Sequence, residues 1–142
     1  MPNLMSRVVL IVAVILMVSQ FAYAQPQVTS EDPDINKLML SPWLQHPKTK
    51  ETIITVGDAY QKHFGSTDWG KYSDNQGNKY IGFKGAFDNG TVVVPMEFYF
   101  NYKGALKAYK MGDNEEDVRM GIMLLARLVT KDADQWKREN GY

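Results

Sequence analysis

A two-residue alternation in the middle of the chain most restricts the possible folds. Between residues 91 and 102, apolar side chains stand at every second position: Val92, Val94, Met96, Phe98 and Phe100. Successive side chains of a strand point to opposite faces, so this pattern predicts a strand with one face on a core. Pro95 has no N–H for a sheet ladder, which predicts an edge position or a bulge at this residue.

Turn signals around this strand predict its neighbours in the sheet. Asn89-Gly90 accepts positive φ at low cost, as a tight hairpin requires. Before this turn, alternating residues predict strands at 69–73 and 79–87. After the strand, Lys103-Gly104 turns the chain into a further predicted strand at 105–111. The sequence therefore predicts a four-stranded antiparallel meander.

A short helix is predicted before the sheet. Thr55 can accept the amide hydrogen of Asp58, and the Asp58 carboxylate can reach back as in a capping box. Helical spacing of apolar residues continues to Phe64, and Gly65 suits the left-handed residue that ends a helix. We expect a helix at Val56–Phe64. The apolar residues 35–44, which Pro42 interrupts, are expected to form a short strand or one turn of helix.

A long helix is predicted in the last part of the chain. Asp113 would be its cap and Glu116 the partner in a capping box. A stripe with steps of three and four follows: Val118, Ile122, Leu125, Val129, Ala133 and Trp136. Leu124 and Leu128 widen this stripe, which predicts a helix that is deeply docked and not perched on the surface. We therefore expect an α+β fold with a short helix, the four-stranded meander and a long C-terminal helix packed on one sheet face.

The start of the chain has the pattern of an export signal. Arg7 precedes an unbroken apolar run at 8–18, and Ala22-Tyr23-Ala24 offers the small residues that a signal peptidase needs. As a helix this run would span only about 16 Å, well short of the ~30 Å core of a bilayer. Residues 1–24 are thus predicted to be a cleaved signal peptide, although an uncleaved membrane anchor is the alternative. We expect a periplasmic or secreted protein with no membrane span after cleavage.

Composition limits the remaining chain further. Residues 25–34 are predicted to be a flexible lead-in and residues 35–142 a single domain. The 16 basic and 16 acidic side chains balance, so no field of one sign favours nucleic acid. The chain has no cysteine, which removes disulfides and a lipid anchor on cysteine and favours a bacterial envelope protein.

Motifs that carry chemistry are absent from the sequence. It has no Gly-x-Ser-x-Gly, no phosphate-binding glycine loop and no His-Glu-x-x-His. His46 and His63 are the two histidines, and Asp58 stands five residues before His63, a step unsuited to two ligands on one helix face. We therefore expect no catalytic residues, no metal site and no cofactor, with His63 as a boundary residue of its helix.

Methionine is the other residue type that could hold a metal. The positions after the predicted signal peptide are Met39, Met96, Met111, Met120 and Met123. Copper proteins of the periplasm use methionine, but we expect these side chains to fill the core.

The second face of the predicted sheet is the candidate binding surface. Its predicted residues are Tyr80, Lys84, Glu97, Tyr99, Lys107 and Tyr109. Tyrosine offers apolar area and a polar tip, so such a face suits a protein, a peptide or a glycan. The alternative is a solvated face on which tyrosine serves strand formation alone.

Three functions stay open from the sequence. The first is a non-enzymatic binding module of the envelope, such as an inhibitor or an accessory subunit. The second is a small hydrolase or ligand carrier, built around Glu97 and a pocket between the sheet and the C-terminal helix. The third is a structural protein whose helix stripe dimerises; we expect a monomer or a weak homodimer.

One segment resembles a known group of proteins. It starts with Thr55-Val56-Gly57-Asp58-Ala59-Tyr60, continues through Phe64 and Trp69, and ends in Tyr80-Ile81-Gly82-Phe83-Lys84-Gly85. This order resembles small exported bacterial proteins of unknown function, which have a Thr-Val-Gly-x-Ala helix start, a following Trp and a Phe-x-Gly strand. The resemblance covers about residues 52–102 and implies a small α+β envelope domain without catalytic residues.

Overall fold

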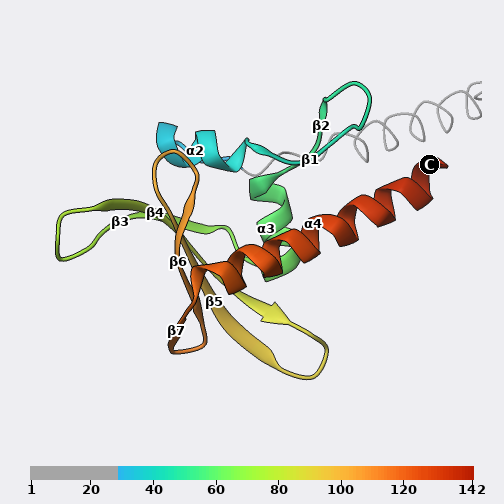
Figure 1. Cartoon of the computed structure of the whole chain (residues 1–142). Coiled ribbons are helices and arrows are strands. Elements are labelled where there is room, and N and C mark those ends of the chain that lie inside the picture. Colours follow the sequence, from blue (N-terminus) through green and yellow to red (C-terminus); the bar gives the residue numbers. More distant parts are fainter. Residues whose placement is uncertain (1–28) are drawn as a thin grey trace, which may run out of the picture.

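The computed structural model describes residues 29–142. The predicted signal peptide, residues 1–24, lies outside the described residues, as do residues 25–28 of the predicted lead-in. The elements are α2 (Pro33–Met39), β1 (Pro42–Gln45), β2 (Thr52–Thr55), α3 (Val56–Phe64), β3 (Asp68–Ser73), β4 (Lys79–Asp88), β5 (Val93–Phe100), β6 (Leu106–Met111), β7 (Asn114–Glu116) and α4 (Val118–Asn140). The fold class is α+β, as predicted, and both sheets are antiparallel (Figure 1).

The larger sheet is a meander with the strand order β3-β4-β5-β6-β7. Its first four strands are the predicted ones, and β7 adds a fifth that the prediction lacks. Gly112, with a φ of 64°, turns the chain after β6, so that Asn114 pairs with Met111. The predicted helix start at Asp113 is therefore wrong. Asp117 caps α4 instead, and its carboxylate accepts the amide hydrogen of Arg119 at 2.9 Å.

Pro95 lies in the central strand and not at an edge. The register with β6 ends at the pair Met96↔Met111, and the Pro95 carbonyl accepts the amide of Gly112 at 2.8 Å. A residue's N–H and C=O point to the same neighbouring strand, so the missing N–H of Pro95 faces a point where β6 has already ended. The sheet therefore loses no ladder bond at Pro95.

The apolar face of the alternating strand lies on the core, as predicted. Met96, Phe98 and Phe100 are buried there, and they meet Tyr60 and Phe64 from α3. Val92 is 53 % exposed, because it precedes β5 at the tip of the β4–β5 hairpin.

The short helix α3 matches its predicted bounds. The Thr55 hydroxyl accepts the amide hydrogen of Asp58 at 3.3 Å, and Gly65 ends the helix with a φ of 62°. Upstream, a short strand or a turn of helix is predicted for residues 35–44. The structure has both, because helix α2 is followed there by strand β1. The helix α2 buries Ile35 and Met39 against Ile81 of β4.

The long helix α4 meets the rest of the fold through a side that overlaps the predicted stripe but is turned away from Ile122, with Leu124, Leu125 and Leu128 in or against the core. Its buried residues are Gly121, Leu128 and Asp132, whereas Ile122 is 51 % exposed. A Cβ atom on Gly121 would come within 2.8 Å of the Tyr109 ring, so the helix approaches β6 closely at this glycine. The buried side of α4 differs from the predicted stripe because it includes Gly121 and Asp132, and a search for apolar residues at helical spacing passes over both residue types.

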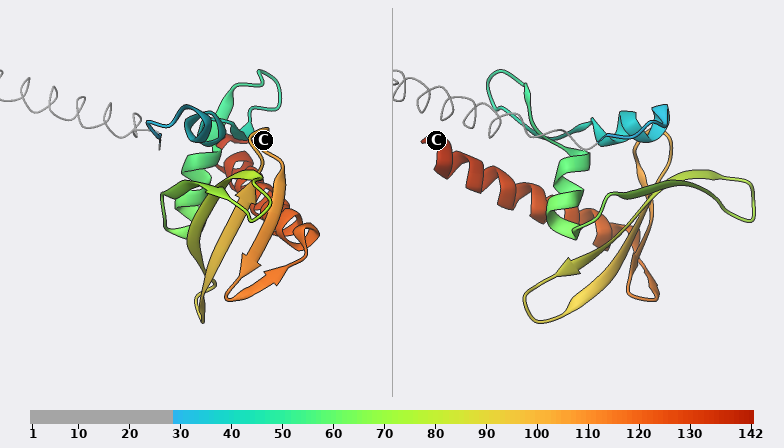
Figure 2. Two further views of the ribbon diagram at one scale, coloured as in Figure 1. Left: turned by 90° about the vertical axis from the view of Figure 1, so that its left-hand side faces the viewer. Right: turned by 180° about the vertical axis from the view of Figure 1, so that it is seen from behind.

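The helices lie on one face of the larger sheet, and α4 runs past α3 to the β1–β2 hairpin (Figures 1 and 2). There His46, in the hairpin loop, packs against Trp136 and Tyr142 with ring centroids 5.3 and 5.9 Å away. Among residues 29–142, no helix is both long enough and apolar enough to cross a membrane. The opposite face of the sheet is not covered by any helix of the described residues.

Candidate binding face of the sheet

Three of the predicted site residues lie together on the uncovered face of the larger sheet. Lys84 pairs with Glu97 across β4 and β5, and Tyr99 lies two residues along β5 from Glu97. Tyr80 also faces outward, but it lies near the beginning of β4, where its hydroxyl donates to Asp74 at 3.2 Å. The centre of the face is therefore formed by Lys84, Glu97 and Tyr99.

The prediction is wrong for Tyr109. This residue pairs with Phe98, stacks on it with ring centroids 5.2 Å apart, and is only 1 % exposed. The reason is a bulge in β6: Tyr99 pairs with Ala108, but Phe100 pairs with Leu106, which leaves Lys107 as an extra, exposed residue. One extra residue turns every later side chain of the strand to the other face.

The same bulge brings Lys110 to the uncovered face, opposite Glu97. Tyr72 of β3 is the second residue that the sequence reasoning missed. Its ring lies across Gly82, where a Cβ atom would come within 2.5 Å of the Tyr72 ring and 2.9 Å of the Tyr99 ring. Gly70 and Gly82 face each other in the register, and together they leave a recess for these two rings. Glycines at matching outward positions were the sequence signal for this recess.

We call these five residues the tyrosine patch: Tyr72, Lys84, Glu97, Tyr99 and Lys110. The patch is joined through Glu97, which accepts the Tyr99 hydroxyl at 3.2 Å and lies 3.6 Å from Lys84 and 4.0 Å from Lys110. Lys84 also lies over the Tyr72 ring at 5.2 Å, and the Tyr72 and Tyr99 rings meet edge to face at 5.5 Å.

The electrostatics of the patch follow from these contacts. Burial, and then the nearby Glu97 carboxylate, raises the pKa of Tyr99 to about 12. Tyr99 is therefore a neutral hydrogen-bond donor at physiological pH, and it helps to hold Glu97 as an acceptor between two ammonium groups. The contacts thus hold two rings and three charges at defined positions on the uncovered face of the sheet.

A second polar cluster surrounds Asp132 on the covered side of the molecule. This buried carboxylate accepts hydrogen bonds from Trp43 at 2.8 Å, from Lys62 at 2.7 Å and from His63 at 2.7 Å. Burial on its own would raise the pKa of Asp132, but the hydrogen bonds from Lys62, His63 and Trp43 outweigh it and keep the pKa below its usual value. The cluster links β1, α3 and α4, and the sequence reasoning missed Asp132.

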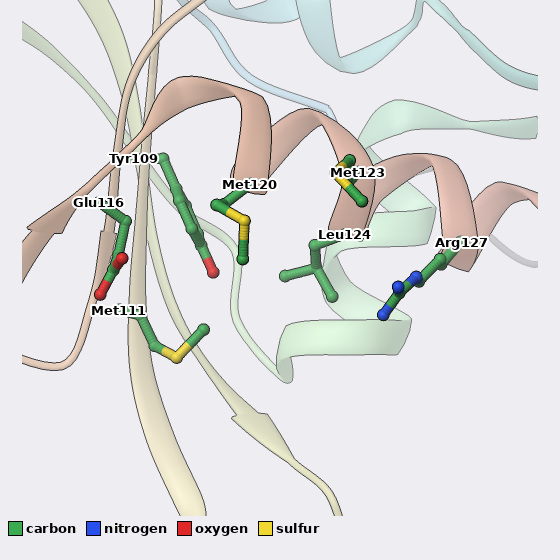
Figure 3. A pocket seen from close by; sticks show the side chains of 7 residues that line it. All are labelled: Tyr109, Met111, Glu116, Met120, Met123, Leu124 and Arg127. Atoms are coloured by element: carbon green, nitrogen blue, oxygen red, sulfur yellow. The ribbon is translucent and has the colours of Figure 1, made fainter.

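A cleft of about 370 Å³ lies between the sheet and α4 (Figure 3). Tyr109, Met111 and Glu116 line it from the sheet, and Met120, Met123, Leu124 and Arg127 line it from the helix. Neither Glu97 nor His63 borders it, so the cleft does not support the hydrolase built around Glu97.

The cleft also corrects the prediction for the methionines. Met39 and Met96 are buried as expected, but Met111, Met120 and Met123 are 40 %, 54 % and 52 % exposed. The described residues hold no group of three or more His, Cys, Asp or Glu side chains placed to bind a metal ion.

Comparison with known proteins finds no relative of this chain. No protein-family model, no curated protein and no solved structure matches the chain.

Proposed function

We propose that this protein is an exported, non-enzymatic binding module of the bacterial envelope, which holds a partner protein on the tyrosine patch. The observation that carries the proposal is the patch itself: two tyrosines and three charged side chains are joined by mutual contacts on a sheet face that no described helix covers. The predicted signal peptide at residues 1–24 supports the location.

The chemistry of the patch favours a protein as the partner. Tyrosine side chains bury much area on binding while losing little conformational freedom, and they are enriched at protein interfaces. Lys84 and Lys110 lie on either side of Glu97 and are about half exposed, so the patch presents alternating charge over a short distance. A partner surface with acidic groups around one basic group would complement this pattern.

The pre-formed contacts within the patch lower the cost of binding. The Tyr72 and Tyr99 rings rest in the recess over Gly82, and Tyr99 is held by Glu97, so few side-chain rotations remain to be lost. These properties fit an inhibitor or an accessory subunit, which binds through a rigid surface and carries out no reaction of its own.

A photo-crosslinking experiment tests the proposal. A benzophenone amino acid replaces Ala108, which pairs with Tyr99 on the patch face, or Thr130, an exposed residue of α4. After irradiation of cells that export the protein, we expect the Ala108 probe to give an adduct of one defined mass that the Thr130 probe does not give. Adding the Lys84→Glu and Lys110→Glu substitutions should abolish this adduct, because they reverse the charges around Glu97.

Lys103→Glu combined with Lys48→Glu serves as the control, since it makes the same change of net charge at exposed residues outside the patch. Identical adducts from the Ala108 and Thr130 probes, or an adduct that survives the patch substitutions, would contradict the proposal. Capture of cell-wall glycan in place of protein would show that the face binds a different class of partner.

A further inference from the structure

The cleft beside α4 is bordered by apolar side chains that the described fold leaves in contact with water. Met111, Met120 and Met123 are each between 40 % and 54 % exposed. Clustered exposure of long apolar side chains marks an interaction surface more often than a free surface. Methionine is suited to such a surface because its unbranched side chain adapts to the shape of a partner.

Opposite charges stand at the two ends of this cleft. Glu116 borders the end nearest β7, Arg127 borders the other end, and the methionines of α4 lie between them (Figure 3). Within residues 29–142, neither Glu116 nor Arg127 forms an ion pair. Both charges are therefore available to a molecule that enters the cleft.

The order of these residues is self-complementary. Glu116, the last residue of β7, borders one end of the cleft, and Met120, Met123 and Arg127 follow at steps of three and four on one side of α4. The midpoint of the set lies between Gly121 and Ile122. If a second α4 lies antiparallel about this midpoint, Met120 meets the other Met123, and Glu116 meets the other Arg127.

We infer that this surface is the interface of a two-fold symmetric homodimer, with α4 of one copy packed antiparallel against α4 of the other. In a two-fold interface the same surface occurs on both copies, so each residue pair is formed twice. The exposure also fits. Met120 and Met123 line the cleft and are about half exposed, so those of one copy can contact those of the other.

The size of the contact sets the expected affinity. The α4 part of this surface, residues 118–127, spans about 14 Å along the helix, which is short for a stable protein interface. We therefore expect a dimer that forms and dissociates with concentration. The tyrosine patch lies on the other face of the sheet, so the dimer would leave it uncovered.

Charge exchange tests this pairing. Sedimentation equilibrium is measured on the protein expressed from its full coding sequence and purified in the form that the cell exports. Arg127→Glu and Glu116→Arg each place like charges together twice in the dimer, and each should raise the dissociation constant by at least about tenfold. The double variant E116R/R127E restores opposite charges across the interface, and its dissociation constant should return to within about threefold of the original.

Lys103→Glu is the matched control, because it reverses an exposed charge in the turn between β5 and β6. It should leave the dissociation constant unchanged, and circular dichroism should show the same fold for every variant. A chain that stays monomeric up to about 1 mM would overturn the inference, since even weak complexes are populated at that concentration. The inference would equally be wrong if the double variant dissociated as readily as either single variant.

Discussion

Asp132 is a single buried charge that connects three elements of the fold. Its carboxylate is bound by Trp43, Lys62 and His63, which come from two other elements. Removing one partner of a buried ion pair leaves the other charged groups buried without a partner. The loss of stability is larger than the loss caused by replacing the whole pair with apolar residues. The cluster therefore holds the β1–β2 hairpin, α3 and α4 together.

We expect Asp132→Asn to lower the free energy of unfolding by about 2–4 kcal/mol, which is less than the ~3–5 kcal/mol for breaking a fully buried pair, because Lys62 stays half exposed to water. Urea unfolding followed by circular dichroism measures this change. Asp134→Asn is the matched control on an exposed position of the same helix, and it should change stability by less than about 0.5 kcal/mol.

The pH dependence of this difference follows from the lowered pKa of Asp132. A carboxyl group with a lower pKa in the folded state stabilises the protein above its unfolded pKa of about 3.8, and this contribution is lost as the pH falls through the folded pKa. The stability gap between the native chain and Asp132→Asn should thus be full at pH 7 and shrink below pH ~4. A gap that is equally large at pH 7 and pH 2.5 would show that the carboxylate charge is not the cause.

At the scale of the elements, β6 decides which residues the sheet offers to each side. Its bulge at Lys107 places Leu106 and Tyr109 on the core and Ala108 and Lys110 on the uncovered face. If Lys107 instead took a regular paired position, every residue after it would change face, which would expose Tyr109 and bury Lys110. The bulge therefore determines which side chains of β6 join the core and which join the tyrosine patch.

Deletion of Lys107 removes the extra residue, so that Leu106, Ala108 and Tyr109 can pair regularly with β5 on their present faces. We therefore expect the deletion to destabilise the protein by less than about 2 kcal/mol. Lys107→Ala keeps the length of the strand and should change stability by less than about 0.5 kcal/mol, because this side chain is exposed. Thermal unfolding of both variants gives the comparison. A deletion that costs more than about 3 kcal/mol would mean that the sheet needs the local twist of the bulge as well as its effect on the alternation.

The same strand marks the limit of what the sequence could predict. Alternation and turn residues were enough for β3 to β6, and capping residues with Gly65 were enough for both ends of α3. A bulge has no such pattern, because Lys107 fits a regular exposed position equally well. In α4, the contact at Gly121 and the buried Asp132 depend on Tyr109, Trp43 and His63, which are distant in the sequence. Lys84, Glu97 and Tyr99 could be predicted to share one face of the sheet because they lie on strands before the bulge.

At the scale of the whole molecule, the sheet separates two surfaces of different character. The tyrosine patch is polar and internally paired, whereas the cleft beside α4 is apolar with one unpaired charge at each end among the described residues. Surfaces on opposite faces of one sheet can be occupied together. A homodimer built through α4 would then present two tyrosine patches, and a partner with two matching surfaces would bind it more tightly than it binds one copy.

Dimer formation also has a thermodynamic consequence for the whole fold. An interaction that requires the folded chain stabilises it by mass action, so its melting temperature depends on protein concentration. We expect the melting temperature of the native chain to rise by a few degrees between about 10 µM and 1 mM, while that of Arg127→Glu stays constant. Differential scanning calorimetry at both concentrations measures this. The E116R/R127E variant should regain the dependence, and equal shifts in all three chains would trace the effect to a contact other than the α4 cleft.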